Sequence, residues 1–291
     1  MAKADPALEQ EYQRLQAEDD AAQAEIQKWK SENARFKATG KGLSDEDLDK
    51  HIRDSRQKVR KAYERFIARY PNYAEAHLTF GSFLSEIEDE AGAQAQWEKA
   101  LQIDPKMAVA YNNLAGIHTE RGDFKRASEY FSRAIALNPS DGSFYHNFGD
   151  STYVLRKAVM AQDGLNEQQV FARALSLYSN AFRLDPTNYL FASDLAQTYY
   201  ALTPLPFETA LNAWTNTLAV AQSENQRELA SIHLARLKML SGRLAEARAH
   251  LAGVTNQECL QLKSNLLARI VERENAPKAE TPPAADGAKK E

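Results

Sequence analysis

The chain has 291 residues, of which 43% are hydrophobic and 26% charged, and its formal net charge is −4. These values are those of an ordinary soluble protein with enough apolar residues to bury a core. No apolar run approaches the length needed to cross a bilayer, so no membrane span is expected. The net negative charge is far from the basic footprint of nucleic-acid-binding proteins, and we expect no nucleic-acid partner.

The single cysteine, Cys259, rules out an intrachain disulfide and is typical of a protein from a reducing compartment. Its place on an apolar helix face predicts a small core residue rather than a reactive thiol. The first residues lack the apolar stretch of a secretory signal. We therefore expect a cytoplasmic location.

The first predicted helix covers residues 6–37, followed by a linker to residue 42. Apolar side chains recur along it every seven residues, with two more placed four residues after members of this series: Leu8, Leu15, Ala22, Trp29 and Phe36, then Tyr12 and Ile26. A seven-residue apolar repeat favours a helix packed along one partner helix. The partner can be a second copy, which would make 6–37 a coiled-coil arm for homo-oligomerisation. Alternatively, the helix lies back on the chain itself.

A second helix is predicted within residues 43–73. Ser44 followed by Asp47 resembles a capping box, and acidic residues in the first turn suit the helix dipole. One apolar face follows, made of Leu48, Ile52, Val59, Tyr63, Phe66 and Tyr70. We expect this helix to stand immediately before a repeat array.

From residue 74 onwards, small and aromatic residues recur with a period of 34. The matched sets are Gly81/Ala93/Trp97/Ala100, Ala115/Ala127/Phe131/Ala134 and, with an insertion after its first member, Gly149/Ala174/Tyr178/Ala181. Each set is followed by a proline: Pro105, Pro139 and Pro186. The residue before a proline is pushed out of the α region, so each proline predicts the end of a helix.

This period, with its paired small and aromatic residues, resembles the tetratricopeptide repeat. The resemblance implies an all-α solenoid of helix hairpins over residues 74–255. The five expected repeats are 74–107, 108–141, 142–188, 189–224 and 228–255. Residues 43–73 would be a degenerate leading half-repeat, because Pro71 precedes Pro105 by one full period. Residues 256–274 would cap the array, and 275–291 would be disordered.

The third repeat carries 13 extra residues between Gly149 and Ala174. Asn166 with Gln169 predicts a helix start, and Gly164 predicts a break before it. We therefore expect one long helix over about 143–161 and a second over about 167–184. The apolar side chains of the insertion either pack within this longer hairpin or leave an exposed tip for a partner, formed by Val159, Met160 and Leu165.

In the tetratricopeptide family the first helices of the repeats line a concave groove. We assign side chains to this groove by counting positions along each first helix. The candidate partner-binding residues are Asn112, Asn113, His146, Asn147, Asp150, Tyr153, Asp194, Gln197 and Tyr200. The same count also places Leu78, Ser82, Ser85, Thr119 and Ser193 in the groove. Asn113, Asn147 and Asp194 occupy one equivalent position in successive repeats. Such side chains can either bond the backbone of an extended peptide or find partners within the fold.

No motif in the sequence predicts catalysis, since it has neither a glycine-rich phosphate loop nor a His-Glu-x-x-His signature. The six histidines are scattered, and we expect structural roles for them rather than metal ligation. The prediction is a non-catalytic scaffold without cofactor or metal that binds a protein or peptide. The alternatives are an assembly protein acting through residues 6–37 and an accessory subunit of an enzyme complex.

Overall fold

The computed structural model describes residues 6–37, 39–40 and 42–275. Over these ranges the chain forms fourteen α-helices and one short 3-10 helix, with no strand. The predicted all-α architecture is therefore confirmed. The helices divide into two compact units that meet at Gly164 and Leu165, inside the third predicted repeat. The tail expected to be disordered was 275–291: Asn275 is the last residue of a helix, and residues 276–291 lie outside the described ranges.

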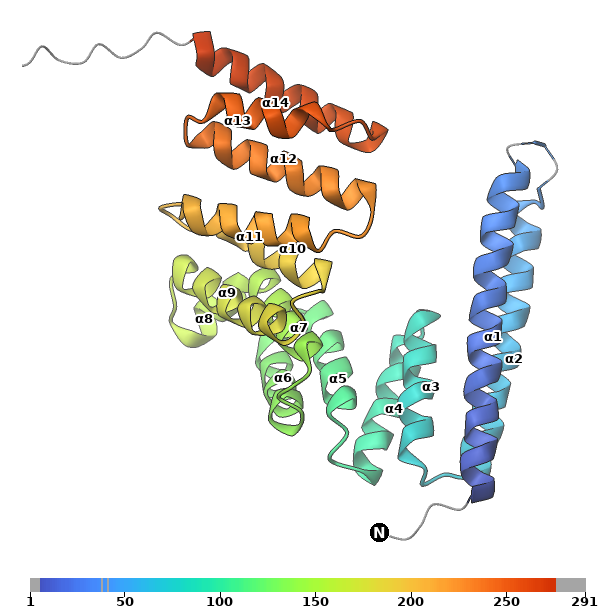
Figure 1. Cartoon of the computed structure of the whole chain (residues 1–291). Helices are drawn as coiled ribbons and strands as arrows, with labels where there is room; N and C mark the ends of the chain where they lie inside the picture. The colour runs from blue at the N-terminus through green and yellow to red at the C-terminus, as the bar shows by residue number, and fades with distance from the viewer. Residues whose placement is uncertain (1–5, 38, 41, 276–291) are drawn as a thin grey trace, which may run out of the picture. The chain divides into compact units, whose positions relative to one another are not determined.

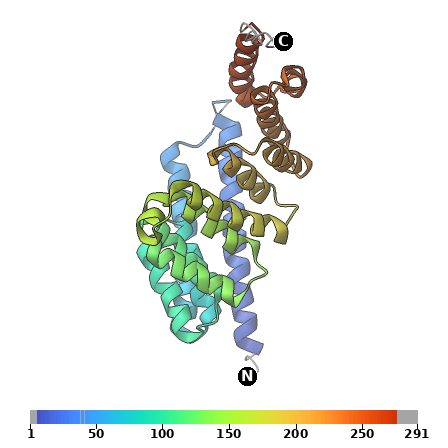
Figure 2. The same ribbon diagram turned by 90° about the vertical axis from the view of Figure 1, so that its left-hand side faces the viewer.

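Helices α1 (Pro6–Lys37) and α2 (Asp45–Arg69) form an antiparallel pair at the start of the first unit (Figure 1). Figure 2 shows the same pair from the side. Tyr12 and Leu15 of α1 are buried in one cluster with Val59, Tyr63 and Phe66 of α2. The Tyr12 hydroxyl also donates to the Glu75 carbonyl oxygen at 3.2 Å. The first helix therefore lies back on its own chain.

The rest of the first unit is built from helix hairpins. Its helices are α3 (Ala74–Glu86), α4 (Glu90–Ile103), α5 (Ala108–Glu120), α6 (Phe124–Leu137), α7 (Gly142–Val154) and α8 (Arg156–Asp163). Asp89 and Asp123 begin α4 and α6, because each carboxylate accepts the backbone N–H three residues later. Asp104 and Asn138 end the same helices, each directly before a proline.

The contact between small and aromatic residues holds each hairpin together. Gly81 of α3 lies against the indole of Trp97 of α4, whose Nε1 donates to the Leu78 carbonyl oxygen at 3.1 Å. In the next hairpin Ala115, Ala127 and Phe131 are fully or almost fully buried. Phe131 also stacks on Phe148 of α7, with ring centroids 5.3 Å apart, which joins one repeat to the next.

The insertion does not lengthen the first helix of the third repeat, and that prediction is wrong. α7 ends at Val154, the chain turns at Leu155, and a separate helix α8 follows. Glu86, Glu120 and Val154 follow one another at intervals of one repeat period, so the first helices of all three repeats end at one position. The extra residues form α8, which packs against α6 and α7.

The second unit begins with α9 (Glu167–Leu184), whose bounds match the prediction and which starts with a complete Asn166/Gln169 capping box. The remaining elements are α10 (Tyr189–Thr198), the 3-10 turn (Tyr199–Ala201), α11 (Phe207–Ala219), α12 (Glu224–Leu240), α13 (Leu244–Ala252) and α14 (Gln257–Asn275). α14 buries Cys259, Leu266 and Ile270 against α12 and α13. In the described part of the chain, no helix is both long and apolar enough to cross a bilayer.

Candidate functional site

The first helices of three successive repeats line one cavity of the first unit, which we call the polar groove. Its volume is about 480 Å³. The lining residues are Ser82, Ser85, Glu86, Glu90, Trp97, Asn112, Asn113, Gly116, Ile117, Thr119, Glu120, Phe131, Asn147, Asp150 and Ser151. Polar side chains of α3, α5 and α7 thus make up most of the lining, whereas Trp97 and Phe131, which come from the second helices, are almost fully buried.

A chain of amides joins α7 to α5 on the lining of the polar groove. Asn147 Nδ2 donates to Asn112 Oδ1 at 3.1 Å, and Asn112 Nδ2 donates to Asn113 Oδ1 at 3.3 Å. One bond therefore joins neighbouring repeats, although Asn147 reaches Asn112 rather than its equivalent, Asn113. The Asn113 amide nitrogen has no hydrogen-bond partner among the described residues. An amide group there can donate to a peptide carbonyl oxygen.

A second polar link joins α5 to α7 on the same surface. The Thr119 hydroxyl bonds the Ala115 carbonyl oxygen at 3.0 Å and the Ser151 hydroxyl at 2.8 Å. Ser151 is fully buried, whereas Thr119 is half-buried. The link therefore joins the first helices of two successive repeats.

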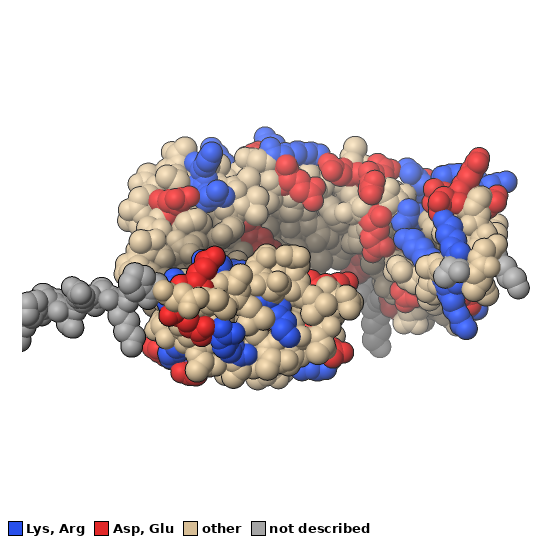
Figure 3. Space-filling view, turned by 90° about the horizontal axis from the view of Figure 1, so that it is seen from above, with Lys and Arg blue, Asp and Glu red and all other residues tan. Residues whose placement is uncertain are grey.

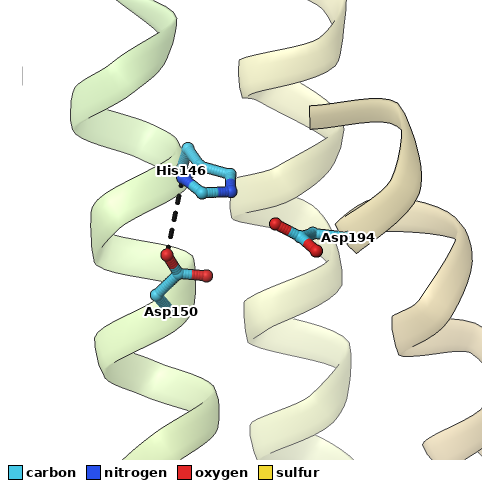
Figure 4. Close-up of side chains that lie close together, drawn as sticks. All are labelled: His146, Asp150 and Asp194. Atoms are coloured by element: carbon cyan, nitrogen blue, oxygen red, sulfur yellow. Dashed lines mark ion pairs between the residues drawn. The ribbon is translucent and has the colours of Figure 1, made fainter. Parts of the chain in front are cut away.

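His146 does not line the polar groove, which corrects its assignment there. Its side chain is buried, and Nδ1 lies 3.5 Å from Oδ2 of Asp150, one turn further along α7 (Figure 4). Of this pair, only Asp150 is among the lining residues. Tyr153, assigned to the same surface, is half-buried. Asp194, also labelled in Figure 4, belongs to α10 of the second unit.

The candidate residues of the second unit include one that serves its core. Tyr200 donates to the His233 carbonyl oxygen at 3.3 Å, and the ring of His233 stacks on Trp214 with centroids 3.9 Å apart. Burial raises the pKa of the Tyr200 hydroxyl and lowers that of His233 to about 4. Tyr200 therefore anchors α12 to its neighbours, whereas Gln197 is exposed and Asp194 half-buried.

The prediction that Val159 forms part of an exposed apolar tip is wrong. This side chain is fully buried, because α8 folds back onto α6 and α7 instead of projecting from them. Met160 and Leu165 are half-buried. Val154, the last residue of α7, is an exposed apolar side chain at 64% exposure. A single exposed valine does not make an apolar patch.

Two further histidines, His77 and His118, also have structural contacts. His77 is buried, with Nδ1 2.7 Å from Gln96 Oε1 and Nε2 3.1 Å from the Pro71 carbonyl oxygen. His118 is buried as well, and burial lowers its pKa although Asp123 lies 3.5 Å from Nδ1. On the face shown in Figure 3 several Lys and Arg side chains gather at the right-hand end, with Asp and Glu side chains beside them.

The polar groove also contains residues that the sequence analysis left out. Glu86 and Glu120 are the last residues of α3 and α5 and occupy equivalent positions in successive repeats. Glu90, at the start of α4, is a third carboxylate on the lining. The recurrence of glutamate after one repeat period is the signal that could have identified Glu86 and Glu120.

Comparisons with known proteins agree with this architecture. The tetratricopeptide repeat family model matches residues 108–141. The photosystem I assembly protein Ycf3 of Cyanophora paradoxa is 32% identical over 131 residues, which are 43% of this chain and 75% of Ycf3. The protein O-mannosyl-transferase Tmtc1 of Drosophila melanogaster is 31% identical over 78 residues, 26% of this chain. The chain covers only 9% of Tmtc1.

Solved structures show the same fold. PilF of Pseudomonas aeruginosa matches with a TM-score of 0.54 at 17% identity, over 89% of this chain and 98% of that protein. YrrB, described as a TPR protein with an unusual peptide-binding site, matches with a TM-score of 0.53 at 15% identity, over 74% of this chain and 99% of YrrB. With the repeat period, the helix hairpins and the similarity to Ycf3, these matches show that the chain belongs to the tetratricopeptide repeat family.

Proposed function

We propose that this chain is a non-catalytic scaffold that holds a peptide segment of a partner protein in the polar groove of its first unit. The tetratricopeptide fold supports protein–protein interaction in general. The observation that carries the proposal is the amide chain Asn147–Asn112–Asn113, which joins α7 to α5 on the lining of a cavity of about 480 Å³ and ends at the Asn113 amide nitrogen, a donor. Such a donor can pair with the backbone of a bound segment, whatever its side chains are.

The relatives favour the same class of function. Ycf3 is named as an assembly protein, and YrrB is described as having a peptide-binding site. An assembly role needs a surface that grips another chain without changing it. The polar groove offers such a surface, because a bound segment would meet amide and hydroxyl groups already fixed by bonds between the repeats.

A binding experiment with groove variants tests this proposal. The tagged full-length chain is used to capture partners from cells of its source, and these are identified by mass spectrometry. The double variant Asn113→Ala/Asn147→Ala should weaken binding of the specific partner by about 1–3 kcal/mol, the worth of two hydrogen bonds. Asn265→Ala on α14, where the amide bonds only Gln261 of its own helix, is the matched control. Equal affinity for wild type, double variant and control would refute a role for the polar groove.

A further inference from the structure

The charged side chains that line the polar groove are all acidic. They are Glu86, Glu90, Glu120 and Asp150, and no lysine or arginine is among the lining residues. The chain as a whole carries 36 basic and 40 acidic residues, so an even mixture would have placed basic residues there too. The polar groove is therefore far more acidic than the average surface of the protein.

Two of these carboxylates occupy positions that are unfavourable for the isolated protein. Glu86 ends α3 and Glu120 ends α5, so each lies at the negative end of its own helix dipole. Among the described residues, neither of them nor Glu90 forms an ion pair. The only side-chain hydrogen bond to these three carboxylates within the described ranges comes from Gln23, whose Nε2 lies 3.0 Å from Glu86 Oε2. A cation from outside the protein would relieve this repulsion.

The surroundings of Glu86 add to the negative field. Burial and the nearby Asp19 carboxylate raise the pKa of Glu86, and Arg56 only partly offsets them. Asp150, on the opposite side of the groove, accepts a contact from His146. The cavity between them also offers the side-chain amides of Asn112, Asn113 and Asn147, which can bond the backbone of a bound segment.

We propose that the peptide held in the polar groove is basic, with lysine or arginine side chains that pair with Glu86, Glu90 and Glu120. This inference rests on the proposed function, since it names the chemistry of the segment that the amides hold. An acidic segment or a free C-terminal carboxylate would meet only like charges on the lining. Attraction of a basic segment should also speed association and make binding sensitive to salt.

Selection of peptides by the full-length chain tests the inference. A display library of random linear decapeptides is selected on the wild-type protein, and the affinities of the enriched peptides are measured by fluorescence anisotropy. We expect the enriched peptides to be rich in lysine or arginine and to bind more weakly as the salt concentration rises. The variant Glu86→Gln/Glu90→Gln/Glu120→Gln should bind them at least about threefold more weakly, because exposed ion pairs are individually modest.

Two further variants make the outcome unambiguous. Glu129→Gln/Glu224→Gln/Glu272→Gln removes the same number of charges from exposed positions outside the polar groove and should leave the affinity within about twofold of wild type. The variant Asn113→Ala/Asn147→Ala tests whether the enriched peptides bind in the polar groove. Enriched peptides that are neutral or acidic but depend on these two asparagines would overturn the basic-peptide inference alone. No enriched peptides, or peptides insensitive to Asn113→Ala/Asn147→Ala, would overturn the proposed function and the inference with it.

Discussion

The hydroxyl of Tyr63 on α2 donates a hydrogen bond of 2.7 Å to the carboxylate of Asp19 on α1, and both side chains are buried. Burial raises the pKa of Asp19, although this bond and a second one from Gln23 oppose the shift. A carboxylate inside a helix pair destabilises the fold unless it is hydrogen-bonded. The Tyr63–Asp19 bond therefore determines how well the first helix stays on the chain.

Removing this hydroxyl should lower stability without changing the core volume much. We expect Tyr63→Phe to reduce the free energy of unfolding by about 1–3 kcal/mol, because the Asp19 carboxylate keeps its burial and loses its strongest donor. Denaturant unfolding measures the change. Tyr130→Phe is the control, since the Tyr130 hydroxyl has no hydrogen-bond partner in the described chain, and it should stay within about 0.5 kcal/mol of wild type. Equal stability of both variants would contradict the role given to this bond.

The heptad positions of α1 should matter for folding rather than for self-association. Leu15 is 5% exposed and packs in the core cluster, whereas Phe36, on the same seven-residue series, is 48% exposed. We expect Leu15→Ala to cost about 2–5 kcal/mol and Phe36→Ala less than about 0.5 kcal/mol. Thermal melts give the stabilities, and sedimentation gives the oligomeric state. A Leu15→Ala protein that keeps its stability but loses an oligomer would restore the coiled-coil interpretation.

Two helix glycines should respond in opposite directions to the same substitution. A Cβ at Gly81 would overlap the Trp97 indole, whereas a Cβ at Gly116 would meet no atom within 4 Å. We expect Gly81→Ala to destabilise the protein by about 1–3 kcal/mol. Gly116→Ala should stabilise it by about 0.5–1 kcal/mol, because alanine loses less backbone entropy in a helix. Calorimetric melting compares the two variants. A similar increase in melting temperature for Gly81→Ala and Gly116→Ala would show that the Trp97 side chain can move aside.

The carboxylate of Glu228 should stabilise the second unit in a pH-dependent way. It accepts the backbone N–H groups of Thr255 and Asn256 before α14, at 2.8 and 2.9 Å, and these bonds lower its pKa. A lowered pKa stabilises the fold above the ordinary value near 4.5, and this contribution disappears as the pH falls through the folded-state value.

We therefore expect Glu228→Gln to melt at a lower temperature than wild type at pH 7, since its NH2 group would face backbone donors. The difference should shrink as the pH falls below about 4. Glu272→Gln, exposed on α14, serves as the control and should melt like wild type at both pH values. A difference that stays constant across this range would exclude the carboxylate charge as its cause.

Much of the fold follows from residues that act locally. Asn166 and Gln169 predicted the start of α9, and Asp185 before Pro186 predicted its end. The turn at Leu155 was missed because no proline or glycine marks it. α7 ends at the same position of the repeat as α3 and α5. Only an alignment of the repeats, which places Glu86, Glu120 and Val154 at one position, would have predicted this end. Local signals thus fix helix ends, whereas this break depends on the register of the repeats.

The groove was harder to predict than the helices. Position counting selected Asn112, Asn113, Asn147 and Asp150, which line the cavity, but it also selected His146, which is buried. Counting positions along a helix predicts in which direction a side chain leaves the backbone, but it does not predict which group that side chain contacts. His146 turns to Asp150, and Asn147 crosses to Asn112. The burial of Val159 likewise depends on α8 folding back, which its own apolar pattern cannot reveal.

The placement of α1 along α2 has a consequence for growth of the array. A stack of identical modules is open-ended, since the outer module can accept another copy and start a filament. Here Tyr12, Leu15 and Ile26 of α1 are buried against the protein's own chain. A second molecule would therefore contact the polar outer side of α1. The apolar face of α1 is therefore already occupied within the chain and is not available for pairing with a second copy.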